Sequence, residues 1–272
     1  MLKIGVVTDE ISGDLKESIE IARSWGLEYI ELHSVWGNNI CDVDEATLSR
    51  AIKIVRESGL TVTNIDSLTL RCYLSNDDEY SEHIKHLLRS IDIAPFFNTN
   101  IVRLFSFWKE KNIEEKWGQV FEKMELPVKI AEREGIILGF ENVSSGNIGT
   151  SSDLARLFEY FNSPNLKLIW DPGNAYAAGE EKPFPNGYEK IKDKIIHVHV
   201  KDALFDANGK NVWKPIGKGK LDYTGQLKAL LKDGYNGVIA LETHCVAANG
   251  SKIDGTKESL DGLMQIIKGI KE

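Results

Sequence analysis

Four polar residues in the second half of the sequence each close a short apolar run of the kind that forms a buried strand. They are Glu141, Asp171, His199 and Glu242. The residue before each is apolar, in chain order Phe140, Trp170, Val198 and Leu241. Because successive side chains of a strand point to opposite faces, the four polar groups should all point away from the apolar face. Three carboxylates brought together repel one another, and a divalent cation removes that cost. Three oxygen ligands with one imidazole favour Mn²⁺, Mg²⁺ or Co²⁺, with Zn²⁺ as a further option.

The run Ile195–Asp202 shows this alternation most clearly. One face of an extended strand here carries Ile196, Val198 and Val200. The other face carries His197, His199 and Lys201. Burying such a polar face is costly unless it binds something there. The run therefore predicts a strand that lines a polar site.

The elements that must position these residues alternate between strand-like and helix-like runs along the chain. The expected strands span 3–8, 28–32, 60–65, 100–105, 136–141, 166–170, 195–201 and 237–241. The expected helices span 14–26, 44–58, 77–97, 113–134, 151–161, 187–194, 222–232 and 255–270. Eight such units predict an α/β protein with a single (β/α)₈ TIM barrel, whose chemistry lies at the carboxyl ends of the strands. A doubly wound open sheet is the alternative.

Composition narrows the classes of function. The chain has 272 residues, of which 42% are hydrophobic and 27% are charged, and we expect one domain over residues 1–272. The formal net charge of −8 disfavours a nucleic-acid partner. Three cysteines without paired spacing favour a reducing compartment. With neither a signal peptide nor a membrane-length apolar run visible, we expect a cytoplasmic protein with no membrane partner.

Several segments resemble a known family. ENVSSGNIG, KLIWDPGNAY, HVHVKD and ALETH look like the xylose isomerase-like TIM barrels of the sugar isomerase/epimerase superfamily. The resemblance implies that one metal ion is held by Glu141, Asp171, His199 and Glu242. It also implies that Glu141 and Glu242 form the acid/base pair, and that the chain forms a homodimer or homotetramer. Many epimerases of this family carry a substrate-contacting histidine where this chain has Asn174.

Further polar residues are candidates for substrate binding. Lys201 could reach a substrate oxygen, or form a salt bridge at the barrel rim. Arg103 could bind a carboxylate or phosphate, or brace the barrel mouth through an ion pair. His197 could contact substrate, orient a ligand or be a hydrogen-bonded core residue, and Glu31 could bind substrate hydroxyls or form an ion pair. Asn174 completes this set of predicted substrate contacts.

These residues support one leading hypothesis and three alternatives. The leading one is a metal-dependent isomerase or epimerase that moves a proton next to the carbonyl of a small polyhydroxy ketone or aldehyde, through an enediolate. The first alternative is a dehydratase of a keto-inositol at the same metal site, and the departure at Asn174 keeps it open. The others are a sugar-binding protein without turnover and a nuclease related to apurinic endonucleases.

Overall fold

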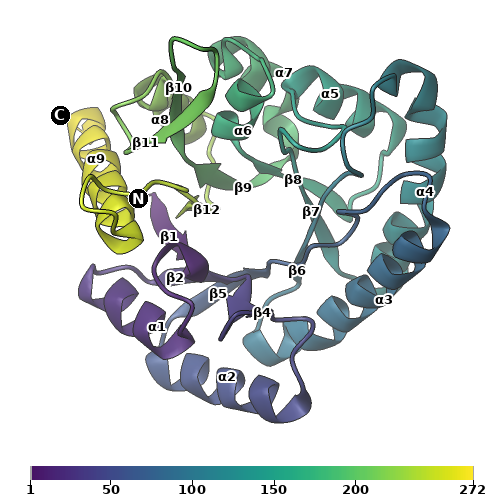
Figure 1. The fold of residues 1–272 in the computed structure, drawn as a ribbon, viewed down its shortest axis with the longest axis horizontal. Coiled ribbons are helices and arrows are strands. Elements are labelled where there is room, and N and C mark those ends of the chain that lie inside the picture. The colour runs from purple at the N-terminus through teal and green to yellow at the C-terminus, as the bar shows by residue number, and fades with distance from the viewer. Residues whose placement is uncertain (1, 272) are drawn as a thin grey trace.

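Eight parallel strands close into a barrel in the order β1-β12-β9-β8-β7-β6-β5-β2, and helices surround it (Figure 1). The computed structural model describes residues 2–271. The barrel strands are β1 (Lys3–Val7), β2 (Tyr29–Leu32), β5 (Thr61–Ile65), β6 (Ile101–Leu104), β7 (Ile137–Glu141), β8 (Leu166–Trp170), β9 (Ile195–Val200) and β12 (Val238–Leu241). This topology confirms the predicted (β/α)₈ barrel and excludes the open sheet.

The helices begin and end where the sequence supplies capping residues. Their bounds are α1 (Leu15–Ser24), α2 (Glu45–Ser58), α3 (Asp77–Ile93), α4 (Ile113–Glu134), α5 (Ser151–Tyr160), α6 (Pro172–Ala177), α7 (Tyr188–Ile191), α8 (Tyr223–Lys232) and α9 (Lys252–Lys271). The side chains of Asp14 and Asp44 accept hydrogen bonds from backbone N–H groups in the first turns of α1 and α2. Gly59 and Gly135 end α2 and α4 with φ values of 74° and 68°.

One predicted helix is wrong in extent. The expected helix 77–97 ends as an α-helix at Ile93, and a 3₁₀ turn, η2, covers Ala94–Phe97. Pro95 in this turn has no N–H to continue the α-helical hydrogen bonds. The segment 187–194, expected to form a short helix at most, forms one turn of α-helix, α7, continued by a 3₁₀ turn over Lys192–Lys194.

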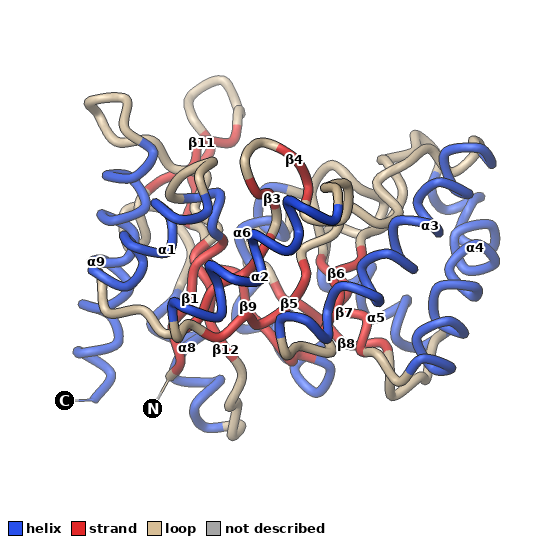
Figure 2. The backbone as a smooth tube through the Cα atoms, turned by 90° about the horizontal axis from the view of Figure 1, so that it is seen from below, coloured by secondary structure: helices blue, strands red, loops and turns tan. Residues whose placement is uncertain are grey.

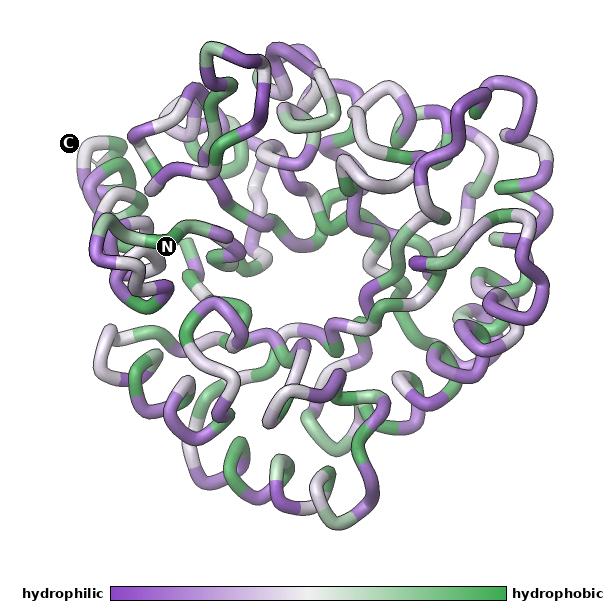
Figure 3. Tube along the Cα trace, in the orientation of Figure 1, coloured by the Kyte–Doolittle hydropathy of each residue, from purple (hydrophilic) through white to green (hydrophobic). Residues whose placement is uncertain are grey.

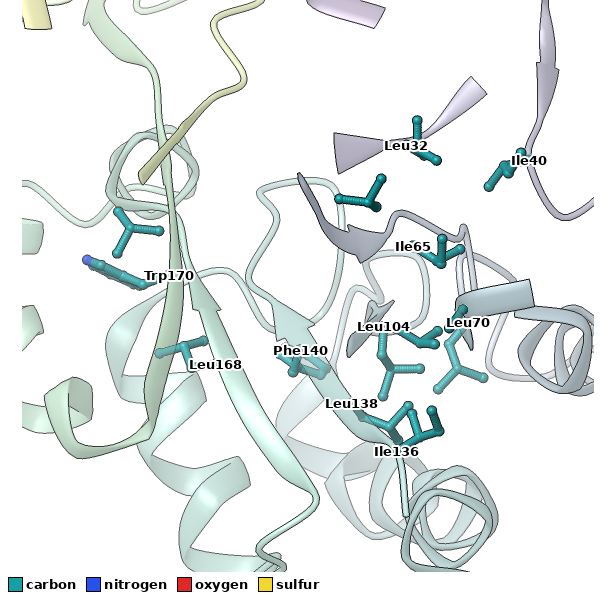
Figure 4. Packing of buried hydrophobic residues seen from close by; sticks show 14 of the residues in the cluster. Leu32, Ile40, Ile65, Leu70, Leu104, Ile136, Leu138, Phe140, Leu168 and Trp170 are labelled. Atoms are coloured by element: carbon teal, nitrogen blue, oxygen red, sulfur yellow. The ribbon is translucent and has the colours of Figure 1, made fainter. Parts of the chain in front are cut away.

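The core lies between the outer faces of the strands and the inner faces of the helices. In Figure 3, hydrophobic and hydrophilic residues alternate along the surrounding helices. On α1 the buried positions are Leu15, Ser18, Ile19 and Ala22, which share one helix face. Figure 4 shows Leu138 and Phe140 of β7 and Leu168 and Trp170 of β8 in the buried cluster. Because these apolar residues face the helices, their polar neighbours face the barrel interior.

Two small hairpins extend the mouth of the barrel. They pair β3 (Ser34–Val35) with β4 (Asn38–Asn39) and β10 (Asp202–Phe205) with β11 (Asn211–Lys214). In Figure 2 both rise from the same side of the molecule. The Asp202 carboxylate accepts hydrogen bonds from the backbone N–H groups of Gly217, Gly219 and Leu221, which fixes the chain that returns from the second hairpin. Within residues 2–271, none of the helices has the length and apolar character needed to cross a membrane.

Candidate metal centre

Glu141, Asp171, His199 and Glu242 converge at the carboxyl ends of four neighbouring strands. Each offers one ligand atom, and these atoms all lie within 4.8 Å of one another. Glu141 ends β7, His199 lies in β9, and Asp171 and Glu242 directly follow β8 and β12. All four side chains are buried. Ligands 2.0 to 2.6 Å from one ion must lie about this close together, so the spacing suits a single bound cation.

Two ligand atoms of this group are not fully satisfied by the protein. Nδ1 of His199 is buried and has no hydrogen-bond partner. Oδ2 of Asp171 is also buried and lies 2.9 Å from the ammonium of Lys201, while Oδ1 caps α6 by accepting from the backbone N–H of Asn174 at 2.8 Å. A buried polar atom without a partner is costly, and coordination of a cation would satisfy the His199 nitrogen. The donor set therefore fits a divalent metal ion.

Two cations lie against the carboxylates of the group. The ammonium of Lys201 forms ion pairs with Asp171, at 2.9 Å, and with Glu242. The guanidinium of Arg103 contacts Glu141 at 2.8 Å and Glu242 at 3.2 Å. Both cationic side chains are buried. They offset part of the repulsion among the acids and restrict the carboxylates to a few orientations.

The pKa values show that negative charge is still in excess. The pKa of Asp171 is raised to about 6, chiefly by burial and also by nearby Glu141 and Glu242, although Lys201 acts in the opposite direction. Burial would lower the pKa of His199, but the carboxylates of Glu31, Glu141 and Glu242 raise it well above its usual value. The raised pKa of His199 shows that the carboxylates around this imidazole favour positive charge at its position.

Glu31 and His197 lie on the other side of the His199 ring. Nε2 of His199 donates to Glu31 at 2.9 Å, while Nδ1 faces Glu141 at 3.3 Å and Glu242 at 3.5 Å. Nε2 of His197 donates to the second oxygen of Glu31 at 2.6 Å. The Glu31 carboxylate thus holds the proton of His199 on Nε2, so that Nδ1 can coordinate a metal ion. Carboxylates play this orienting role toward many metal-binding histidines.

Above the ligand group lies a cleft of about 250 Å³. Its lining includes the two glutamates, Glu141 and Glu242, but not the fully buried Asp171 and His199. Lys201, Arg103 and Asn174 also line it. The further lining residues are Val7, Asp9, Glu10, His33, Arg71, Phe105, Val143, His244 and Lys252. The volume is below the usual range for drug-sized ligands, so the cleft suits a small molecule.

Comparison with known families agrees with the barrel fold. A family profile described as "Xylose isomerase-like TIM barrel" matches residues 19–266. The chain belongs to this family. The xylose isomerase-like match spans all four ligand candidates and the cleft residues from His33 to Lys252.

Relatives and solved structures of this xylose isomerase-like chain include epimerases and dehydratases. An inosose dehydratase of Bacillus licheniformis is 28% identical over 143 residues, which are 47% of this chain and 47% of that protein. The chain thus matches about half the length of the curated relatives. A D-tagatose 3-epimerase-like protein has a TM-score of 0.78 at 20% identity, covering 99% of this chain and 98% of that one. The IOLI protein with a bound zinc atom has a TM-score of 0.80 at 16% identity, with 99% of each chain covered. At these identities the two structures show a shared fold.

The structure separates the predicted substrate contacts of this barrel into two groups. Arg103, Asn174 and Lys201 line the cleft. Asn174 donates from its side chain to Glu141 at 3.1 Å and to the backbone oxygen of Asn142 at 3.0 Å. Glu31 and His197 do not line the cleft, and His199 stands between Glu31 and the two acids. Glu31 and His197 are therefore placed to orient the imidazole of His199. This orienting role is one of the alternatives that the sequence left open for His197.

Among the residues of this centre that sequence reasoning missed are Asp66 and Arg71. Asp66 follows β5, is fully buried and forms an ion pair with Arg103. Its place at a strand end was a usable signal, because polar residues at the ends of the other strands form the site. Arg71 lies in the loop after β5 and lines the cleft. No periodic pattern marks a single arginine in a loop, so the sequence held no signal for it.

Proposed function

We propose that this chain is a divalent-metal-dependent isomerase or epimerase of a small polyhydroxy ketone or aldehyde. The reaction moves a proton on the carbon next to the carbonyl. One observation carries the proposal: two glutamates of a metal-ligating group also line a small cleft. Family membership supports it, because relatives and neighbours of this barrel include epimerases and dehydratases.

The proposed metal ligands are Glu141, Asp171, His199 and Glu242, and Mn²⁺, Mg²⁺ or Co²⁺ suits this oxygen-rich set. The zinc atom in the IOLI structure keeps Zn²⁺ among the candidates. A bound ion would polarise the substrate carbonyl and so make the neighbouring C–H group more acidic. Asp171 and His199 are fully buried below the cleft, so their only role is to hold the ion.

Glu141 and Glu242 are the proposed proton carriers. Of the four ligands only these two line the cleft, where a substrate carbon would lie. They come from β7 and from the end of β12, with β8 and β9 between these strands in the barrel. They therefore approach a bound substrate from different directions. One glutamate removes the proton and the other returns it, to the opposite face of the carbon in an epimerase.

The remaining polar groups hold this pair in place. Arg103 contacts both glutamates through one nitrogen, Nη1, which fixes their separation. Lys201 donates to Glu242 and lines the cleft, so its ammonium can stabilise negative charge that develops on a substrate oxygen. Asn174 donates to Glu141, and it stands where many epimerases of the family carry a histidine. Glu31 and His197 orient His199.

A dehydratase is the second candidate, because the curated relatives include several inosose dehydratases. Removal of the proton next to the carbonyl is the first step of this reaction as well. The two reactions then differ in whether the carbon is protonated again or a neighbouring hydroxyl leaves as water. Both use the same glutamate pair, so product analysis distinguishes them.

The test begins with metal analysis of the purified protein and continues with a panel of ketoses and keto-inositols in D₂O, followed by NMR. An epimerase or isomerase incorporates solvent deuterium at one carbon, whereas a dehydratase yields an enone or dione. At the same protein concentration as the wild type, the Glu242→Gln variant should form neither product. Unchanged metal content and unchanged turnover in Glu242→Gln would show that the proposed site is wrong.

A further inference from the structure

Arg71 differs from the other cationic residues of the cleft in having no anionic partner. Arg103 pairs with Asp66 and the two glutamates, Lys201 with Asp171 and Glu242, and Lys252 with Glu10 at 3.5 Å. Among residues 2–271, no carboxylate lies within 4.0 Å of the Arg71 guanidinium, and its buried Nε has no hydrogen-bond partner. Within the described residues the cleft therefore contains one arginine that no carboxylate neutralises and whose buried Nε donor is unused.

Aromatic rings fix the position of this guanidinium. Its central carbon lies 5.0 Å from the centroid of Phe105 and 4.9 Å from that of Trp108. Contacts of this kind hold a cation near the faces of the rings without using its N–H donors. Those donors can bind a planar or tetrahedral anion.

The backbone around Arg71 is held by the same aromatic residues. The N–H of Phe105 donates to the carbonyl of Thr69 at 3.1 Å, and the N–H of Trp108 donates to the carbonyl of Cys72 at 2.9 Å. Leu70, between these bonds, has a φ of 66°, an uncommon conformation for a branched residue. Such conformations persist where the surrounding structure enforces them, often at binding sites. The loop thus presents Arg71 in one fixed position.

We propose that Arg71 binds an anionic group of the substrate, a carboxylate or a phosphate, while the carbonyl end lies at the metal centre. The inference rests on the proposed function and narrows its substrate to an acidic sugar derivative. A neutral sugar would leave a desolvated guanidinium without a counter-charge, which is costly. An anionic group supplies that charge and accepts two parallel N–H bonds. The small volume of the cleft favours a compact acid.

The neighbouring imidazole does not supply an alternative cation. The pKa of His33 is lowered to about 4, chiefly by burial and also by the charges of Arg103 and Arg71, although the carboxylates of Asp9 and Glu242 act in the opposite direction. His33 is therefore neutral near pH 7. Since Arg103 and Lys201 are already paired with buried carboxylates, the guanidinium of Arg71 is the group that can discriminate between charged and neutral substrates.

Calorimetric titration tests the inference with three probes of similar carbon skeleton. These are neutral D-fructose, the carboxylate 5-keto-D-gluconate and the phosphate ester D-fructose 6-phosphate. In the Mn²⁺-loaded protein one of the anionic probes should bind about 10- to 100-fold more tightly than D-fructose, as expected for charge-assisted hydrogen bonds. The better anion identifies whether the site takes a carboxylate or a phosphate.

Three variants assign this preference to a residue. Arg71→Gln should bring the ratio of anion to neutral affinity close to one, and Arg71→Lys should keep only part of it because an ammonium lacks the fork geometry. Arg50→Gln is the matched control, since Arg50 also stacks on a tryptophan, at 4.1 Å from the Trp36 centroid, but is exposed and outside the cleft. Its ratio should equal that of the wild-type protein.

The outcomes separate this inference from the proposed function. Equal affinity of the wild-type protein for neutral and anionic probes, or a preference that survives Arg71→Gln in a folded variant, overturns the role of Arg71. Far-UV circular dichroism and Mn²⁺ affinity, which Arg71→Gln should leave unchanged, establish folding. If deuterium exchange occurs with neutral sugars alone, the proposed function holds and the inference fails. If Mn²⁺ does not bind the wild-type protein, the proposed function fails, while titration of the metal-free protein still tests the preference for anions.

Discussion

The two halves of the barrel contribute different chemistry to one cleft. The second half, β7 to β12, provides the four proposed metal ligands. The first half, β1 to β6, provides no proposed ligand but two groups that act on the ligands: Glu31 orients His199, and Arg103 contacts both glutamates. Arg71 comes from the same half. The comparison indicates that ligation belongs to one half, whereas orientation and charge around the ion come from both, since Lys201 of the second half pairs with Asp171 and Glu242.

This division predicts that substitutions in the second half affect turnover most. Glu141→Gln should lower the rate of substrate proton exchange by about 10²- to 10⁴-fold, because it removes one of the two proton carriers. Deuterium incorporation from D₂O measures the rate. The control is Glu28→Gln, an exposed glutamate just before β2, which should retain the full rate. Equal rates in the two variants would remove Glu141 from the mechanism.

In the first half the largest effect should be on stability. Arg103→Leu leaves the fully buried Asp66 without its ion-pair partner, so the free energy of unfolding should fall by about 3 to 5 kcal/mol. Urea denaturation measures this fall. Arg133→Leu, at an arginine exposed on α4, should change the free energy of unfolding by less than about 1 kcal/mol. Adding Asp66→Leu to Arg103→Leu should recover part of the loss, and a double variant no more stable than the single one would contradict the explanation.

Metal binding should couple the two halves. An ion that binds only the folded chain stabilises it by about 2.7 kcal/mol at a free concentration 100 times its Kd. We expect Mn²⁺ to raise the melting temperature of the wild-type protein and EDTA to reverse the increase. The same additions should have no effect on Asp171→Asn combined with His199→Asn. A similar increase in that double variant would place the ion elsewhere.

The smallest expected effect distinguishes orientation from ligation. Glu31→Gln removes the carboxylate that accepts from Nε2 of His199 but leaves all four ligands in place. Mn²⁺ affinity should therefore fall by about 10- to 100-fold rather than vanish. Calorimetry measures the affinity, and His199→Asn provides the reference for loss of a ligand. An equal loss in the two variants would mean that Glu31 is itself a ligand.

Much of this architecture could be predicted from local pattern. Strand and helix signals alternate along the chain, and their number predicted the closed barrel that the structure has. Side-chain alternation is a property of each strand alone, so Glu141, Asp171, His199 and Glu242 could be assigned to the inner face before any contact was known. The predicted helix starts at residues 14 and 44 lie within one residue of the observed starts of α1 and α2, where Asp14 and Asp44 are the capping residues. The cytoplasmic setting and the oligomeric state stay predictions.

Contacts across the barrel were decided by the tertiary structure. Glu31 and His197 are 166 residues apart, and their strands are not neighbours in the sheet, so no local signal relates them. Arg71 reaches the cleft only because its loop hydrogen-bonds to the chain that follows β6. A sequence determines which face of a strand a residue occupies, since that depends on its nearest neighbours. Barrel closure and loop packing determine which inward-facing groups meet, because those distances depend on the whole chain at once.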